Sequence, residues 1–179
     1  MTAKDRHSTR LPQYDYREGA FFVTMCTWRR RCLFGKIRAE SVLLSCIGEI
    51  AKQEWIRSKG LRKQISLDAW VIMPNHLHAV VWHRTGGPPL ASETDVGAHC
   101  SAPLHRPSRS LASFVAGFKA SVARRVHQLD GMASVRVWQR GYYDRVIRTE
   151  KELNRIRRYV LENRLRWSLD HLYVADPTI

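Results

Sequence analysis

Ala69-Trp70-Val71-Ile72-Met73-Pro74-Asn75-His76-Leu77-His78-Ala79-Val80-Val81-Trp82 is the stretch from which the fold of this chain can be worked out. Two runs rich in Val, Ile, Leu and Trp, Ile65 to Ile72 and His76 to Trp82, flank Met-Pro-Asn, a pattern typical of two strands joined by a tight turn. Alternate residues of a strand face the same side. We therefore expect His76 and His78 to project side by side, with Leu77, Ala79 and Val81 on the opposite face.

Two neighbouring imidazoles of this kind can bind one divalent metal ion, because imidazole is a common metal ligand. The alternative is that His76 and His78 are two polar residues on an exposed strand face. The His-x-His spacing is compatible with both interpretations, so the choice between them depends on what the rest of the chain supplies.

Composition indicates a folded, strongly basic protein. The chain has 179 residues, of which 44% are hydrophobic, enough for one domain with a real core. Lys and Arg total 30 against 16 Asp and Glu, a formal charge of +14. This excess predicts binding to a polyanion, with nucleic acid first and an anionic membrane surface second. No apolar run approaches the roughly 20 residues of a membrane span, and the first residues lack the apolar segment of a signal peptide.

The cysteines indicate neither a disulfide framework nor a zinc finger. Cys26, Cys32, Cys46 and Cys100 form no C-x-x-C pair and no zinc-finger spacing. We expect reduced thiols, mostly filling the core of a cytoplasmic protein.

Strand and helix patterns alternate along the chain. The predicted strands beyond the hairpin are 20–28 and Tyr142–Ile147, and the predicted helices are Arg38 to Lys59, ended by Gly60, Ser108 to Leu129, and a last one starting at Thr149. Thr149 and Glu152 have the spacing of a capping box. The order strand, helix, strand, strand, helix, strand, helix predicts an α+β fold: a ferredoxin-like βαββαβ antiparallel sheet with an added C-terminal helix that carries Tyr159. Such a fold does not by itself give a function.

Segments outside these elements divide the chain into one domain and its appendages. Residues 1–18 are polar and charged and predict a basic N-terminal arm, and 168–179 form a C-terminal tail. The segment 84–107 is rich in Gly, Pro, Ser and Thr and has no periodicity. This composition predicts a flexible insert within the domain 19–167.

A second candidate group lies on the last predicted helix. Tyr159 and Asn163 are four residues apart and share a helix face, surrounded by Arg155, Arg157, Arg158, Arg164 and Arg166. Tyr159 is either a plain aromatic at a basic surface or a nucleophile whose phenolate nearby cations favour. The amide oxygen of Asn163 can offer a metal an oxygen ligand beside the two histidines. From the residues alone Tyr14, Tyr16, Tyr142 and Tyr143 compete with Tyr159 on nearly equal terms.

Several basic and aromatic residues are candidates for contact with nucleic acid. Three successive arginines, Arg29, Arg30 and Arg31, form either a solvated turn or a clamp for phosphates. Lys119 lies off the apolar stripe of its helix, and Trp138 and Tyr142 can stack on unpaired bases. The remaining candidates are Arg140, Arg155 and Arg158.

Four motifs in order resemble a known family. Met73-Pro74-Asn75-His76-Leu77-His78-Ala79-Val80-Val81, preceded by Ala69-Trp70-Val71-Ile72, resembles the HUH motif (His, bulky hydrophobe, His) of single-tyrosine transposases. Phe114-x-x-x-Phe118-Lys119 follows, then Trp138-Gln139-Arg140-Gly141-Tyr142-Tyr143-Asp144-Arg145-Val146-Ile147-Arg148 and Tyr159-x-x-x-Asn163. Together, from about Tyr14 to Trp167, they look like the REP-associated tyrosine transposases.

The resemblance implies a DNA strand-transfer enzyme in domain 19–167, acting on single strands next to hairpins. From the matching positions in the family, the resemblance implies that His76, His78 and Asn163 bind Mg²⁺ or Mn²⁺. It also implies that Tyr159 attacks the DNA to form a 5′-phosphotyrosine link and release a 3′-hydroxyl. The implied location is the bacterial cytoplasm, in association with the nucleoid, and the implied partner is single-stranded or hairpin DNA. A homodimer is left open. Tyr142 and Tyr143 fall in the strand motif of the family and are expected to be structural or DNA-stacking residues.

The sequence differs from the family pattern in two places, and two other functions are also compatible with the residues. Asn163 is followed by Arg164, where the family commonly has Pro, and the 84–107 insert is longer than usual. A ferredoxin-like module that binds single-stranded nucleic acid without chemistry would also explain the charge. A metal hydrolase that uses water would explain the two histidines without a protein–DNA adduct.

Overall fold

A four-stranded antiparallel sheet forms the centre of the protein. The computed structural model describes residues 18–84 and 110–174. The strand order is β4-β5-β1-β6, with every neighbouring pair antiparallel. The bounds are β1 Gly19–Cys26, β4 Ile65–Met73, β5 His76–His83 and β6 Tyr143–Ile147. This order confirms the predicted ferredoxin-like sheet.

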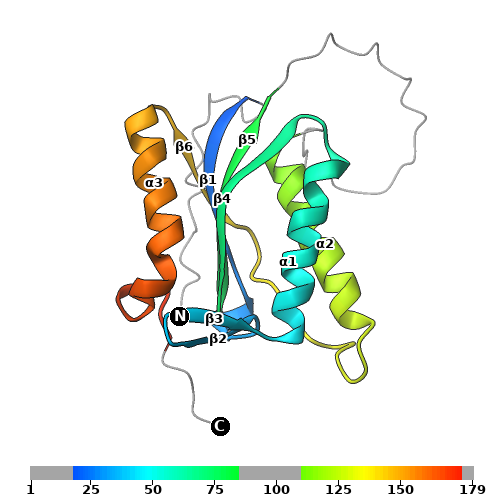
Figure 1. Cartoon of the computed structure of the whole chain (residues 1–179). Helices are drawn as coiled ribbons and strands as arrows, with labels where there is room; N and C mark the ends of the chain where they lie inside the picture. Colours follow the sequence, from blue (N-terminus) through cyan, green and yellow to red (C-terminus); the bar gives the residue numbers. More distant parts are fainter. Residues whose placement is uncertain (1–17, 85–109, 175–179) are drawn as a thin grey trace, which may run out of the picture.

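Helices cover both faces of the sheet. Helices α1 (Cys46–Leu61) and α2 (Leu111–His127) lie on one face, and α3 (Glu150–Glu162) lies alone on the other (Figure 1). A short hairpin of β2 (Gly35–Arg38) and β3 (Ser41–Leu44) sits at one end of the sheet. Two 3₁₀ segments, η1 (Trp28–Arg30) and η2 (Asn163–Leu169), follow β1 and α3.

The two faces of β5 have the residues that strand alternation predicts. Leu77, Ala79 and Val81 are fully buried in the larger core, under α1 and α2. There the indole of Trp55 meets the rings of Phe114 and Phe118 edge-on, which locks the two helices together. The opposite face of β5 carries His76, His78 and Val80 toward α3.

Helix α3 is held on the sheet by its apolar stripe and its cap. Leu153, Ile156 and Val160 pack with Val80 in a second, smaller core, as their spacing predicts. The hydroxyl of Thr149 accepts a hydrogen bond from the Glu152 amide at 3.2 Å, which confirms one half of the capping box. The Glu152 carboxylate accepts instead from the Arg148 amide, one residue before the cap.

The predicted helix from Arg38 to Lys59 is wrong in its first eight residues. Helix α1 begins at Cys46, capped by Ser45, whose hydroxyl accepts from the Gly48 amide, and the preceding residues form the β2–β3 hairpin. Ala39 and Glu40 make its turn with φ of 46° and 61°. Positive φ at both turn residues suits a two-residue hairpin, but that turn is normally marked by Gly or Asn, so the sequence gives no turn signal here.

Smaller differences concern single residues and segments. Gly60 lies inside α1, which ends at Leu61, rather than stopping the helix. Cys46 is exposed and does not fill the core. Tyr14, Tyr16, Cys100 and nearly all of the predicted arm and insert lie outside the described residues. Within the described ranges, no helix is long and apolar enough to cross a membrane.

Candidate metal and tyrosine site

His76 and His78 open strand β5 and point together toward α3. Pairing with β1 places His76 opposite Cys26 and His78 opposite Thr24. Both imidazoles are buried, with side-chain exposures of 0% and 1%, and their ring centroids are 4.3 Å apart. The sequence-based prediction of side-by-side histidines is confirmed, but they are not on an exposed strand face.

Each imidazole has its Nδ1 atom occupied by a neighbour. His76 Nδ1 lies 2.7 Å from Asn75 Oδ1, and His78 Nδ1 lies 2.7 Å from the Thr24 hydroxyl. Asn75 Oδ1 can only accept, so His76 must donate from Nδ1 and keep its lone pair on Nε2. This arrangement of an oriented ring with a free Nε2 is the usual one for metal-binding histidines.

Burial keeps both rings neutral. Removal from water lowers the pKa of His76 well below its ordinary value, and the neighbouring His78 lowers it further. Burial also lowers the pKa of His78, although the Asp170 carboxylate opposes this. Both imidazoles are therefore neutral at neutral pH, with a lone pair on one ring nitrogen, and this is the form that binds a metal ion.

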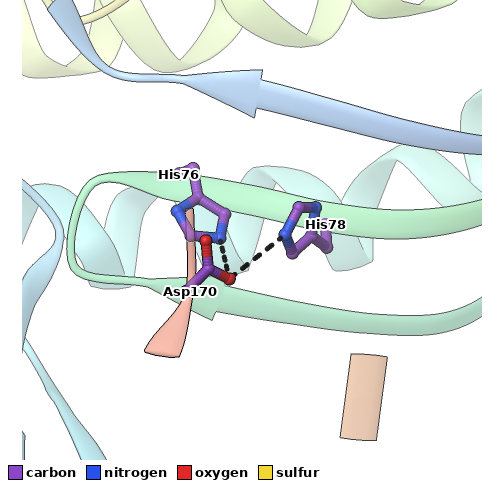
Figure 2. A group of neighbouring side chains, drawn as sticks. All are labelled: His76, His78 and Asp170. Carbon is purple, nitrogen blue, oxygen red and sulfur yellow. Dashed lines mark ion pairs between the residues drawn. The ribbon is translucent and has the colours of Figure 1, made fainter. Parts of the chain in front are cut away.

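Asp170 is the third member of the site, and the sequence analysis did not find it. It follows η2, and its Oδ2 lies 4.0 Å from His76 Nε2 and 3.9 Å from His78 Nε2 (Figure 2). Its Oδ1 accepts a hydrogen bond from the Leu172 amide at 2.7 Å. Burial raises the pKa of Asp170, but His78, the Leu172 amide and Asn163 outweigh it, so the pKa lies well below its ordinary value. The carboxylate is charged.

Asn163 also reaches the site, from the turn where α3 runs into η2. Its amide nitrogen donates to Asp170 Oδ2 at 2.7 Å. Because a carboxylate only accepts, the nitrogen must face Asp170, which turns Oδ1 away from it. That Oδ1 is buried and has no hydrogen-bond partner among residues 18–84 and 110–174.

These donors fit a divalent metal ion. The Nε2 of His76 is likewise buried without a hydrogen-bond partner in the described part of the chain, and buried polar atoms are rarely left unpaired without a reason. Ligand atoms of His76, His78 and Asp170 all lie within 4.8 Å of one another. Two imidazoles with a carboxylate suit Mn²⁺ better than Mg²⁺, which prefers oxygen ligands alone. A ligand role for the amide oxygen of Asn163 stays a prediction.

Tyr159 lies at the open side of this group. Its phenolic oxygen is 3.3 Å from His78 Nε2 and 3.3 Å from Asp170 Oδ2. The ring meets Phe22 edge-on and is 39% exposed. The structure thus brings Tyr159 to His78, across 81 residues of chain.

The electrostatics around Tyr159 differ from the expectation that arginines favour its phenolate. Burial, followed by the charge of Asp170, raises the pKa of Tyr159 to about 12. The nearest charged group of the site is therefore an anion rather than an arginine, and the phenol is neutral at neutral pH.

The predicted DNA-binding arginines are exposed. Arg29, Arg30 and Arg31 follow β1, and the first two have the left-handed φ of 54° and 56°. The Arg30 carbonyl accepts a hydrogen bond from the side-chain amide of Asn75, the residue before His76. This bond connects the basic turn after β1 to the histidine strand. Arg140, Arg155 and Arg158 are also exposed. All six are placed where phosphates can reach them, and their binding role stays a prediction.

Lys119, Trp138 and Tyr142 are engaged in packing instead. The Lys119 ammonium donates to the carbonyls of Gln139, at 3.0 Å, and Gly141. The Trp138 indole donates to the Lys119 carbonyl, and its ring packs on Phe34 and Phe118. Tyr142 packs against the larger core. These contacts give all three a role in packing, and their role in DNA binding stays a prediction.

One relative in sequence shows the family to which the chain belongs. No family model matches the chain. A protein of Haemophilus influenzae (strain Rd), described only as uncharacterized, is 34% identical to this chain in an alignment that covers 94% of this chain and 93% of that protein. The chain belongs to the same family as this Haemophilus protein.

Comparison with solved structures shows which known fold the chain has. The structure of a REP-associated tyrosine transposase bound to a REP hairpin matches 88% of this chain and 73% of its own, with a TM-score of 0.58 and 17% identity. The chain therefore has the fold of the REP-associated tyrosine transposases, as the sequence motifs predict. A Deinococcus radiodurans protein provisionally assigned as a transposase matches at a TM-score of 0.42 and 16% identity, over 87% of this chain and 96% of its own, which is too distant to bear on function.

Proposed function

We propose that this protein is a metal-dependent single-stranded DNA transposase that cleaves and rejoins DNA next to hairpins through a 5′-phosphotyrosine intermediate. The observation that carries the proposal is the position of Tyr159, whose phenolic oxygen lies 3.3 Å from His78 Nε2 and 3.3 Å from Asp170 Oδ2. A nucleophile must stand within contact distance of the groups that position its target phosphate. Within residues 18–84 and 110–174, neither Tyr143 nor Tyr173 has such a contact with either histidine.

His76, His78 and Asp170, with Asn163 Oδ1, are the residues that would hold the metal ion. When bound, a divalent ion would polarise the target phosphate and stabilise charge in phosphoryl transfer. Tyr159 would supply the attacking oxygen, and its edge contact with Phe22 fixes the ring. The exposed arginines Arg30, Arg155 and Arg158 would bind neighbouring phosphates.

The chemistry conserves bond energy and needs no ATP. The Tyr159 oxygen forms a bond to phosphorus while the bond from phosphorus to the 3′-oxygen breaks, and the phenolic proton ends on the released 3′-hydroxyl. In the second half a 3′-hydroxyl from another strand attacks the phosphotyrosine and restores the phenol. The raised pKa of Tyr159 means that the free protein holds a neutral phenol, so attack requires the proton to leave during the step.

A binding module without chemistry is the second candidate, and one observation favours it. The Asp170 carboxylate already accepts a hydrogen bond from Asn163, so this candidate ligand is engaged within the protein without a metal ion. The neutral phenol of Tyr159 is likewise paired with this carboxylate. In this alternative the same fold binds single-stranded DNA, and replacing Tyr159 leaves all activity intact.

Covalent capture separates the two candidates. The protein is incubated with Mn²⁺ and a set of single-stranded DNAs that carry different hairpins, and then denatured. We expect a denaturant-resistant protein–DNA adduct with at least one hairpin, and none with Tyr159→Phe. Cleavage without any adduct would indicate a metal hydrolase, and no reaction across all hairpins would leave the binding module.

Tyr143→Phe is the matched control. Tyr143 is 47% exposed on β6, and its pairing opposite Thr24 places it on the same sheet face as the histidines. Among the described tyrosines, Tyr143 is thus the best alternative candidate for the nucleophile. We expect Tyr143→Phe to form the adduct normally, and an adduct lost in this variant but kept in Tyr159→Phe would overturn the assignment.

A further inference from the structure

The side chain of Asn75 joins three parts of the candidate site. It is fully buried in the turn between β4 and β5. Its Oδ1 lies 2.7 Å from His76 Nδ1, and its Nδ2 donates to the carbonyls of Leu172, at 2.8 Å, and Arg30, at 3.2 Å. One amide therefore contacts the metal-site strand, the segment that carries Asp170, and the basic turn after β1.

The two donor bonds fix which way the amide faces. Both partners of Nδ2 are backbone carbonyls, which only accept, so the nitrogen cannot exchange places with the oxygen without losing both bonds. The oxygen is thereby held toward His76. The backbone of Asn75 is fixed as well, because its carbonyl accepts from the amide and from the hydroxyl of Thr27.

An amide oxygen held in this way decides the tautomer of His76. Oδ1 can pair only with a protonated Nδ1, which leaves the lone pair on Nε2, the atom that lies 4.0 Å from Asp170. The opposite tautomer would bring two acceptors together at 2.7 Å in a buried place, and this is costly. His78 has no equally strict partner, because the Thr24 hydroxyl can donate or accept.

The same amide also positions Asp170. Leu172, whose carbonyl Asn75 binds, is buried, and its own amide donates to Asp170 Oδ1 at 2.7 Å. Asn75 thus reaches Asp170 through a single intervening residue. Without it, the segment that contains Asp170 and Leu172 loses its hydrogen bond to the β4–β5 turn.

We infer that Asn75 is the positioning residue of the metal site: it sets the Nδ1–H tautomer of His76 and anchors the segment that bears Asp170. This inference rests on the proposed function only in so far as that function needs a metal ion. It makes a statement about metal affinity and about a proton position, and both can be measured without DNA.

The test compares Asn75→Ala with Asn75→Asp. Alanine removes the acceptor and both donors, whereas aspartate keeps an acceptor for His76, removes the donors and adds a negative charge. Nitrogen-15 NMR of the metal-free protein reports which ring nitrogen carries the proton, with the His76 signal assigned from its loss in His76→Gln. Calorimetric titration with Mn²⁺ alone gives the affinity, and circular dichroism shows that each variant is folded.

We expect the Nδ1–H form at His76 in the wild type and in Asn75→Asp, and its loss in Asn75→Ala. The Mn²⁺ affinity of Asn75→Ala should fall by about 10- to 100-fold, the usual effect of removing a partner of a ligating histidine, and Asn75→Asp should keep more of it. Thr24→Val, which removes the partner of His78, should leave the His76 tautomer unchanged.

Two results would overturn the inference. One is a wild-type His76 that carries its proton on Nε2. The other is a folded Asn75→Ala protein whose Mn²⁺ affinity stays within about twofold of the wild type, below the usual size of such effects. Because neither readout involves cleavage, an absent DNA adduct together with a normal Asn75 effect would count against the proposed function alone.

Discussion

Arg157 on α3 binds Asp68 on β4 through two parallel hydrogen bonds. Its Nε lies 3.0 Å from Asp68 Oδ1, and its Nη2 lies 2.6 Å from Oδ2. The Trp82 indole donates to the same carboxylate at 2.9 Å. This pair joins the helix that carries Tyr159 to the sheet that carries the histidines, so it sets the distance between the two halves of the site.

Asp68→Asn should lower the free energy of unfolding by about 1 kcal/mol at neutral pH, since the pair is bidentate but Arg157 is partly exposed. The Arg157 bonds lower the pKa of Asp68 below 3.8 in the folded protein. The contribution of the Asp68–Arg157 pair to stability is therefore complete above pH 3.8 and is lost as the pH falls through the lowered pKa of Asp68. Urea unfolding of both proteins along a pH series measures the difference, which should shrink in acid.

The control for Asp68 is Glu162→Gln. Glu162 pairs with Arg166 on the surface, with exposures of 37% and 70%, and such exposed pairs contribute little. This variant should unfold close to the wild type at every pH. A difference for Asp68→Asn that persists unchanged in strong acid would mean that its charge does not stabilise the fold.

Asp170→Asn should lower the pKa of Tyr159 in the metal-free protein. Burial is the first cause of the value of about 12, and the charge of Asp170 is the second. Replacing Asp170 removes the effects of its charge and of its carboxylate hydrogen bond but leaves the effect of burial, so the pKa of Tyr159 should fall but stay above the ordinary 10.0 of the group. Phenolate absorbance during an alkaline titration measures it, taken as the difference between Asp170→Asn and the same protein with Tyr159→Phe. An unchanged pKa would show that Asp170 does not face the phenol.

The same variant should weaken Mn²⁺ binding. Asparagine keeps the shape of the side chain and removes the anionic oxygen that lies 4.0 Å and 3.9 Å from the two Nε2 atoms. Divalent ions bind more tightly to charged oxygen ligands, so the affinity should fall at least about tenfold. If calorimetry shows tighter binding instead, Asp170 occupies the site in competition with the metal.

Substitution of an exposed arginine should change the salt dependence of DNA binding, whereas substitution of Lys119 should not. Each phosphate contact removed lowers the slope of log affinity against log salt by about one. Arg155→Gln should do so, because its side chain is exposed on α3. Lys119→Met should leave the slope unchanged and destabilise the fold, because its ammonium binds two backbone carbonyls. Fluorescence anisotropy with one labelled strand at several salt concentrations measures both slopes, with Tyr159→Phe as the background to prevent cleavage.

What the sequence predicts well here is set by local periodicity. The alternation of β5 separates His76 and His78 from Leu77 and Ala79 without any knowledge of the partner strands. The stripe of α3 likewise places Tyr159 and Asn163 on the side of the helix that meets the site. Each of these predictions needs only the geometry of one element.

What the sequence does not predict depends on contacts between distant segments. Asp170 follows a 3₁₀ turn with no periodicity, and only its bonds to Asn163 and Leu172 bring it to the histidines. Asn75 looks like an ordinary turn residue, since its partners Arg30 and Leu172 are 45 and 97 residues away. One signal was available for Asp170: it is an acidic residue soon after Arg164 and Arg166 in a very basic chain.

Two glycines of α1 should respond in opposite ways to the same substitution. A Cβ at Gly48 would lie 2.1 Å from the Phe34 carbonyl oxygen, whereas a Cβ at Gly60 would meet nothing within 4 Å. Gly48→Ala should therefore destabilise the protein by about 1–3 kcal/mol through overpacking, against its better helix propensity. Gly60→Ala should stabilise it by about 0.5–1 kcal/mol, because alanine loses less backbone entropy in a helix. Chemical denaturation of the two variants measures both effects, and a stabilised Gly48→Ala would show that α1 does not begin against Phe34.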